Sequence, residues 1–590
     1  MPAKILEIRF PIAGLNKRLA YKQQPPFTSP SMMNVRPSDT FLGRDRGGSR
    51  PGLAKSLALQ LGSGNPVRSL SAVTWISSGA PLTQAMAVAN GAIYRETAGN
   101  WSAVGGSLTF ASDIRMAPAE HLQKLYYPDR SSTPLASGTD GVVTTNNTFD
   151  SATYSDWTAV SGLNINDYVL HIYNSTGTVG TYRISAIASG SLTVLDTPAN
   201  GTGLSFRIER APKIYNPSTN AVTLWRATVG TVPQNCKIVW RWRDRILMAG
   251  DPLAPHLVSA SRSGDPLDFD FSKDDELAAF ALQGSQAGAI GDAITAGFAH
   301  TDDCSIVGCK QSIWIMRGDP MSGGRVMPLS ETIGILDQRS WCYTPSGWLF
   351  FMSLDGLYCM PPGCGSSPMG VSRDTIPDDL LAIDASSYTV EMAYDVRDQG
   401  IHLFVTPNSG GQAGTHYWIT TDTERAAGPQ ARFFPCQYPY NYEPLSMFSR
   451  RDSTNADSAV WFGGRDGYVR NHVSTQTTDD GTAISSYVYF GPIDLSQGSG
   501  LHEGLMKELI GTLASSSGTV SWTLHVGSTP EAAFAASAFG VSGSWATAGL
   551  NMKHRPRARG GAFCLKLAST SRWAMESIVA VIERKGVQRL

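Results

Sequence analysis

Two clusters of three arginines each carry the clearest binding chemistry in this chain of 590 residues. A guanidinium group can hold a phosphate or a carboxylate through two parallel hydrogen bonds. The clusters therefore predict contacts with a DNA backbone or with a neighbouring subunit. The structural alternative is that arginines beside glycine and proline bond local carbonyl groups and hold turns; we favour an interface or a turn over DNA. The six candidates are Arg44, Arg46, Arg50, Arg555, Arg557 and Arg559.

The overall charge argues against strong binding of DNA by a single subunit. The chain has 48 Lys and Arg against 49 Asp and Glu, a formal net charge of −1, so no global field attracts a polyanion. A ring of several copies would nevertheless repeat the same arginines around one axis and create a positive collar. The cluster at 555–559 is the better candidate for this collar because it is compact, whereas residues 44–50 belong to an irregular N-terminal segment.

Other reactive residues are spaced in ways that predict no catalytic, metal or cofactor site. The eight cysteines are scattered, and the closest pairs, Cys304/Cys309 and Cys359/Cys364, have four residues between them, where zinc and redox motifs usually have two. The chain also lacks a Gly-x-x-x-x-Gly-Lys-Ser/Thr phosphate loop. It shows neither a secretory signal nor an apolar run of 18 residues. We expect free thiols, a reducing cytoplasm and no membrane insertion.

Short phrases that recur along the chain predict the fold. At Asn90-Gly91, Asp355-Gly356 and Asp466-Gly467 a tight polar turn precedes an apolar and aromatic strand, and such dipeptides supply the positive φ angles of a two-residue hairpin. Repeated hairpins of one style indicate propeller blades, and the irregular spacing indicates a diverged β-propeller. Charged residues make up only 16% of the chain, with 59 Gly and 34 Pro, which suits an all-β protein.

Changes of composition divide the chain into five parts. Residues 1–60 are rich in proline and glycine and predict an extended arm that lies on a neighbouring subunit. Residues 61–137 and 211–484 are expected to form the first and second parts of the propeller. The segment 138–210 is rich in Ser, Thr and Asn and predicts an inserted β domain. Residues 485–590 predict a C-terminal β-rich domain or a closing blade.

Several phrases of this chain resemble one group of proteins, the bacteriophage tail tubular or nozzle-type proteins of short-tailed phages. The likeness spans much of the chain, and none of the phrases is a catalytic fingerprint. The phrases that carry it lie at residues 9–15, 25–30, 34–37, 46–52, 261–269, 333–335, 339–340 and 349–358.

The resemblance implies a structural virion protein and not an enzyme. Six copies would form a homohexameric ring around the DNA channel, below the portal and adaptor proteins and in contact with tail fibres. The ring would retain the packaged genome and let it pass into the host, touching DNA only transiently and without sequence specificity. Such a protein is made in the host bacterial cytoplasm and resides in the tail of the virion.

Two other functions stay open at this point. One is a receptor- or glycan-engaging propeller, with or without hydrolytic activity, for which clustered aromatic residues beside paired carboxylates in one pocket would be the sign. The phrase Ser353-Leu354-Asp355-Gly356 places its glycine one residue too early for the Asp-box of sialidase propellers. The other is a tail hub or stopper protein, which differs from the nozzle only in its position along the tail.

Overall fold

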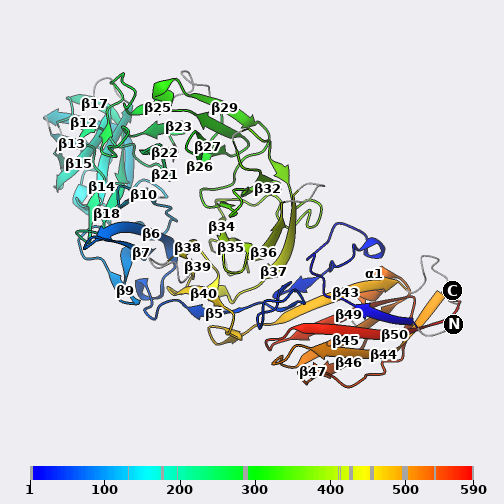
Figure 1. Cartoon of the computed structure of the whole chain (residues 1–590). Coiled ribbons are helices and arrows are strands. Elements are labelled where there is room, and N and C mark those ends of the chain that lie inside the picture. The colour runs from blue at the N-terminus through cyan, green and yellow to red at the C-terminus, as the bar shows by residue number, and fades with distance from the viewer. Residues whose placement is uncertain are drawn as a thin grey trace.

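The computed structural model of this protein consists almost entirely of β-structure. It describes residues 4–587 except 131, 146, 175–178, 196, 283–289, 364, 410, 412, 424–428, 452–457, 495–501 and 537–539. Within these residues, regular structure other than strands is limited to 3-10 turns and one short α-helix, α1 (Pro530–Ala535). The predicted all-β fold class is confirmed, and the chain divides into a propeller, an inserted barrel and a C-terminal sandwich (Figure 1).

Seven antiparallel sheets follow one another around the propeller in the described part of the chain (Figure 1). From the innermost strand outward, blade 1 contains β6 (Val67–Ser77), β7 (Ala80–Ala89), β8 (Ala92–Thr97) and β9 (Asn100–Ala103). Blade 2 contains β10 (Ala119–His121), β11 (Lys124–Tyr127), β18 (Lys213–Asn216) and β19 (Ala221–Leu224). Blade 3 contains β21 (Ile238–Trp242), β22 (Arg245–Asp251), β23 (Ala254–Ala260) and β25 (Phe280–Leu282).

Blades 4 to 7 complete the ring in the same order. Blade 4 contains β26 (Ile294–Thr301), β27 (Cys304–Cys309), β28 (Ile313–Arg317) and β29 (Arg325–Ser330), and blade 5 contains β30 (Trp341–Tyr343), β31 (Leu349–Ser353), β32 (Gly356–Met360) and β33 (Met369–Gly370). Blade 6 contains β34 (Tyr388–Asp395), β35 (Gly400–Pro407), β36 (Thr415–Asp422) and β37 (Gln430–Cys436). Blade 7 contains β38 (Ser446–Arg451), β39 (Ser458–Gly463), β40 (Val469–Val473) and β5 (Gly52–Lys55), with the short β41 (Thr478–Asp479) and β42 (Thr482–Ala483) beyond β5.

Only one of the three predicted two-residue turns is confirmed. Gly467 lies in a longer loop between Gly463 and Val469, and the turn between β31 and β32 is formed by Leu354 and Asp355, with Gly356 as the first residue of β32. Asn90 and Gly91, by contrast, form the two-residue turn between β7 and β8 with φ angles of 48° and 76°, as a tight turn between antiparallel strands requires. Arg243 and Asp244 make the same kind of turn between β21 and β22, with φ angles of 48° and 59° and no glycine. Sequence alone gave no sign of this turn.

Apolar side chains fill the space between neighbouring blades. In β21, Trp240 and Trp242 are buried on one face and pack with Val307 and Met316 of blade 4, while Arg241 between them is exposed. This is the alternation that a half-buried strand produces. Similar clusters join blades 1 and 2, 2 and 3, 4 and 5, and 7 and 1.

The N-terminal segment is built into its own chain, so the expected arm on a neighbouring subunit is wrong. Strand β5 is paired with β40 in blade 7, and this pairing completes the propeller. Strand β1 (Lys4–Ile8) is paired with β50 (Met575–Val587), and β2 (Met32–Met33) with β43 (Ser486–Asp494). Between them β3 (Val35–Arg36) and β4 (Gly48–Ser49) form a small ribbon. The segment therefore satisfies its backbone bonds within the subunit.

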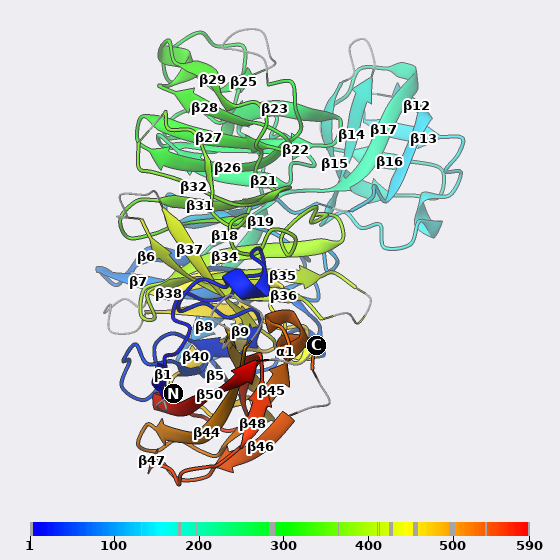
Figure 2. The ribbon, with the colours of Figure 1, turned by 90° about the vertical axis from the view of Figure 1, so that its right-hand side faces the viewer.

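The C-terminal part is a sandwich of two sheets that both recruit an N-terminal strand (Figure 2). One sheet contains β1, β50, β44 (His502–Leu513), β47 (Gly549–Leu550) and β48 (Ala558–Gly560). The other contains β2, β43, β49 (Ala562–Ser569), β45 (Val520–Gly527) and β46 (Gly540–Trp545). Its core, which includes Trp522, Trp545 and Trp573, belongs to one apolar cluster with blades 5 to 7. Propeller and sandwich are thus packed as one body.

A closed six-stranded barrel interrupts blade 2 between β11 and β18. Its strands, in spatial order, are β12 (Ala136–Thr145), β13 (Thr148–Ser151), β16 (Leu192–Val194), β15 (Gly180–Ile187), β14 (Tyr168–Asn174) and β17 (Gly201–Arg210). The predicted inserted domain, residues 138–210, falls within the residues that form this barrel, 136–210. The barrel has its own apolar core around Phe149, Trp157 and Phe206, and it projects from the side of the propeller (Figure 2).

Cysteine chemistry differs from the expectation of free thiols at one position. Cys304 at the start of β27 is disulfide-bonded, whereas Cys236, Cys309, Cys342, Cys359, Cys436 and Cys564 are free and buried. Cys364 lies outside the described residues. Among the residues described, no helix is both long enough and apolar enough to cross a membrane.

Candidate functional site

Arg50 is a structural residue at the junction of the N-terminal segment, blade 7 and the sandwich. Its side chain is only 1% exposed. Its five N–H groups all donate, at 2.5–3.0 Å, to the Asp479 carboxylate, the Asn34 amide oxygen and the carbonyls of Pro51 and Gln437. Asp479 raises the pKa of this guanidinium above its ordinary value although burial opposes the shift. Arg50 is therefore unavailable to DNA or to another subunit, and the structural alternative holds for it.

The other two N-terminal arginines differ from each other. Arg46 forms ion pairs with Asp39, at 2.8 Å, and with Glu576 of β50, so it fastens the segment to the sandwich. Arg44 is exposed, and in the described part of the chain its side chain makes no ion pair. Its backbone is engaged: the N–H donates to the Asp39 carboxylate, and the carbonyl accepts from the peptide N–H groups of Asp39 and Arg46. Of this cluster, Arg44 alone keeps a free guanidinium.

The C-terminal cluster lies on the open edge of one sandwich sheet. Arg555, Arg557 and Arg559 are exposed, and Pro556 and Ala558 between them are buried. Only Arg559 lies in β48, whereas Arg555 and Arg557 precede this strand and Arg557 has a positive φ of 49°. Arg559 pairs with Glu503 at 2.5 Å. Arg555 and Arg557 form no ion pair with any described residue.

Two exposed apolar side chains precede these arginines in the chain, in and after β47 of the same sheet. Leu550 and Met552 are 73% and 84% exposed, which is unusual for large apolar residues. We call the surface of Leu550, Met552, Arg555 and Arg557 the basic edge. Exposed apolar groups beside unpaired cations are typical of a surface that another molecule covers.

A cavity of about 610 Å³ lies at the centre of the propeller. Inner strands from five of the blades bound it, and its wall includes Trp341, Tyr343 and Tyr394 together with Arg339 and Arg451. Glu120 is the one carboxylate among its lining residues, and it accepts a hydrogen bond from the peptide N–H of Thr74. The described lining thus supplies aromatic surface and cations but not the carboxylate pair of a glycosidase.

Arg115 closes the propeller axis beside this cavity. It lies in the connection from blade 1 to blade 2, yet its Nη1 bonds Glu391 Oε1 of blade 6 and its Nη2 bonds Asp337 Oδ2 before blade 5, both at 2.9 Å. Blade 2 faces blades 5 and 6 across the ring, so this side chain spans the axis. Burial raises the pKa of Glu391 to about 7, and Arg115 opposes the shift. The axis of a single propeller is therefore no channel for a duplex.

Four further cations lie near the ends of propeller strands. Arg68 is the second residue of β6, Arg130 follows β11, Lys237 precedes β21 and Arg339 precedes β30. The charge of Asp337 acts on Arg130 and Lys237, and that of Glu391 acts on Arg339. Each of the four cations is half-buried. Arg115 forms ion pairs with both Asp337 and Glu391. In the described part of the chain, none of the four other cations forms an ion pair.

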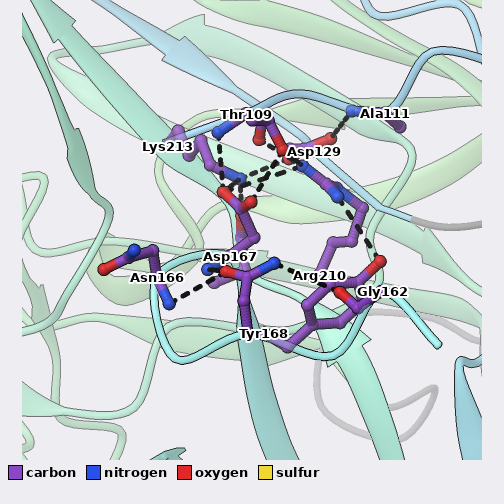
Figure 3. A network of polar contacts seen from close by, with 11 residues as sticks. Thr109, Ala111, Asp129, Gly162, Asn166, Asp167, Tyr168, Arg210 and Lys213 are labelled. Carbon is purple, nitrogen blue, oxygen red and sulfur yellow. Dashed lines mark hydrogen bonds and ion pairs between the residues drawn. The ribbon is translucent and has the colours of Figure 1, made fainter. Parts of the chain in front are cut away.

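A second polar network fastens the inserted barrel to blade 2 (Figure 3). Asp129, after β11, pairs with Lys213 of β18 and with Arg210 of β17, the latter at 3.1 Å. Asp167 of the barrel accepts hydrogen bonds from the N–H and hydroxyl of Thr109 at 2.8 and 2.7 Å. All four ionised groups are buried, so the network fixes the base of the barrel on the propeller.

Sequence reasoning missed the axial residues because no local motif joins them. Arg68, Arg130 and Lys237 come from three different blades, and Arg115 comes from the connection between blades 1 and 2. Arg339 falls inside one of the resemblance phrases, at 339–340, but nothing in that phrase indicates its surroundings. Within the described residues, no group of three or more His, Cys, Asp and Glu side chains is arranged to hold a metal ion.

Comparison with known proteins finds distant structural similarity alone. No family model matches the chain, and no curated protein matches it. Among solved structures, the extracellular domain of BT4673 from B. thetaiotaomicron has a TM-score of 0.35 at 9% identity over 78% of this chain and 43% of that one. Streptogramin B lyase has a TM-score of 0.35 at 9% identity over 72% and 97%, and YCF48 bound to a D1 peptide has 0.25 at 10% over 53% and 98%. Values this low carry no argument about function.

Proposed function

We propose that this protein is a structural subunit of a short-tailed phage tail, a nozzle-type protein that assembles with copies of itself into a ring around the DNA channel. The observation that carries the proposal is the path of the N-terminal segment. Its strands complete both sandwich sheets and blade 7, so the segment links the sandwich to the propeller through paired strands. A mechanical part of a tail needs this continuity.

The resemblance phrases support the proposal by where they lie. Residues 34–37 and 46–52 contain β3, β4 and the Arg50 junction, and 349–358 spans the β31–β32 hairpin of blade 5. The phrases thus coincide with parts that join or build the domains. Of all the resemblance phrases, only 339–340 contributes a residue, Arg339, to the lining of the central cavity.

In this ring, DNA runs between subunits rather than through a propeller. Arg115 and its two carboxylates span the axis of each propeller. The basic edge would supply either a subunit contact or a positive collar, because several copies bring Arg555 and Arg557 together around one axis. A head-to-tail contact of one surface with a different surface closes into a ring when its rotation allows.

Electron microscopy of the purified protein and of phage particles tests the proposal. We expect closed rings with an axial opening wide enough for duplex DNA, and the same ring at the tail of the particle. Its position along the tail separates a nozzle from a hub or stopper. A protein that stays monomeric at all concentrations and is absent from particles would contradict the proposal.

Variants of the basic edge separate its two roles. Replacement of Arg555 and Arg557 by Gln should leave the fold intact, because both side chains are exposed and unpaired in the described residues. If the edge touches DNA, the variant particles should retain or eject DNA differently at low salt, and the difference should shrink as salt rises. If it is a subunit contact, ring assembly itself should weaken. Arg44→Gln is the control, since Arg44 is also exposed but lies far along the chain.

The aromatic wall of the central cavity favours a second candidate, a glycan-engaging propeller. Trp341, Tyr343 and Tyr394 offer surfaces on which sugar rings stack. A glycan screen with the purified protein tests this function. Binding of a defined glycan, weakened by Tyr394→Ala but not by Arg44→Gln, would support it, and a protein that binds no glycan would not.

A further inference from the structure

The cations around the propeller axis outnumber the carboxylates near them. Asp113, Asp337 and Glu391 are the carboxylates whose charges act on the five cations of the axis. The five cations are Arg68, Arg115, Arg130, Lys237 and Arg339. Asp337 and Glu391 are both occupied by Arg115 at 2.9 Å. The cluster thus carries an excess of positive charge even when every carboxylate is ionised.

Burial makes this excess costly. It lowers the pKa of Lys237, and the nearby Arg130 and Arg115 lower it further, whereas Asp337 raises it. Burial is also the main cause that lowers the pKa values of Arg68, Arg130 and Arg339. The Nε of Arg68 is buried and has no hydrogen-bond partner. Charges withdrawn from water without a partner oppose folding, and an anion placed among them removes that cost.

The cluster can be reached from solvent. Arg68, Arg130, Lys237 and Arg339 are partly exposed rather than enclosed, and Arg339 lines the 610 Å³ central cavity. Four of the cations are arginines, whose planar groups hold phosphate or carboxylate oxygens through paired hydrogen bonds. The side chains come from four blades, so one ligand would contact several blades at once.

From this arrangement we propose that the propeller axis is a binding site for a small multivalent oxyanion that carries phosphate or carboxylate groups. Arg130, Lys237 and Arg339 are its contact residues, and Arg115 is held in place beside them by its two carboxylates. The bound anion ties blades 2, 3 and 5 together at the axis. The site goes beyond the nozzle function and does not depend on it.

Calorimetric titration of the full-length protein with pyrophosphate and with citrate, at constant ionic strength set by sodium chloride, tests the site. We expect saturable binding and a rise in melting temperature with at least one of the two anions. Pyrophosphate alone would assign phosphate chemistry, and citrate alone would assign carboxylate chemistry. If neither anion binds, the proposal is wrong.

Matched variants locate the binding. Arg130→Gln should weaken it at least tenfold, whereas Arg325→Gln, which removes an exposed arginine of β29, should leave it unchanged. Asp113→Asn acts in the opposite direction, because it removes a negative charge near Arg68 and Arg130; its side chain is exposed, so the fold should persist and binding should tighten. Equal affinity in Arg130→Gln, Asp113→Asn and Arg325→Gln would place the anion elsewhere and overturn the proposal.

Discussion

Replacement of Arg50 by Met should destabilise the protein strongly, although Arg50 lies in a segment whose composition is that of an exposed arm. The change leaves the Asp479 carboxylate, 2% exposed, without its two charged donors. It also leaves Asn34 and the carbonyls of Pro51 and Gln437 without partners. Removal of one partner from a buried ion pair costs about 3–5 kcal/mol, because the other charge remains buried. The expected loss in free energy of unfolding is of that size.

Urea unfolding followed by tryptophan fluorescence and circular dichroism measures this loss. Arg44→Met is the matched control, since Arg44 lies six positions earlier but is exposed; its substitution should change stability by no more than about 0.5 kcal/mol. The double variant Arg50→Met with Asp479→Leu should recover part of the loss, because it removes the stranded charge. If Arg50→Met unfolds at the same urea concentration as Arg44→Met, the buried pair does not support this junction.

Three further outcomes are expected. Deletion of residues 1–55 removes β1, β2 and β5, which pair with β50, β43 and β40. The deletion should abolish the cooperative thermal transition seen by circular dichroism. A transition near the melting temperature of the full-length protein would show that these strands are dispensable. Asp129→Asn removes the carboxylate that pairs with the buried Arg210 and Lys213, and it should lower the local stability of residues 136–210, measured by hydrogen exchange, by about 3 kcal/mol. Asp156→Asn is the control, because the exposed Asp156 caps a 3-10 turn, and it should cost less than about 1 kcal/mol. The pKa of Glu391 is raised from 4.5 to about 7, so between these pH values the native state binds a proton that the unfolded chain releases. The free energy of unfolding should therefore fall as pH rises from about 4.5 to about 7, by at most about 1.4 kcal/mol per pH unit. Glu391→Gln should remove this pH dependence, and an unchanged dependence would place the titration elsewhere.

The hairpin at Asn90-Gly91 was predictable because its signal is local. A two-residue turn needs positive φ angles, and Asn90 with Gly91 supplies them wherever the two residues occur in a chain. The composition of 138–210 likewise differs from its surroundings, and a closed barrel with its own core fills that part of the structure. Such features depend on residues that are neighbours in sequence.

The role of the N-terminal segment was not predictable for the opposite reason. Proline and glycine indicate extended backbone, but they do not indicate which strand that backbone will meet. Leu53 of β5 pairs with His472 of β40, more than four hundred positions away. The six arginines shared the same limitation: Arg44 and Arg50 look alike in sequence, and only the buried Asp479 beside one of them separates a free guanidinium from a structural one.

The pairing of the two chain ends has a consequence for assembly. Strand β1 pairs with β50, and blade 7 is incomplete until β5 reaches β40. These contacts are far apart in sequence, so their loops close late and at a high entropic cost. The ring of blades must therefore wait for β40, whereas the sandwich must wait for the C-terminal strands from β43 to β50. The basic edge is carried by the same sandwich, at 550–557. A subunit presents this surface in its final form only after the sandwich sheets have gained their N-terminal strands, so completion of the sandwich precedes contact with other copies.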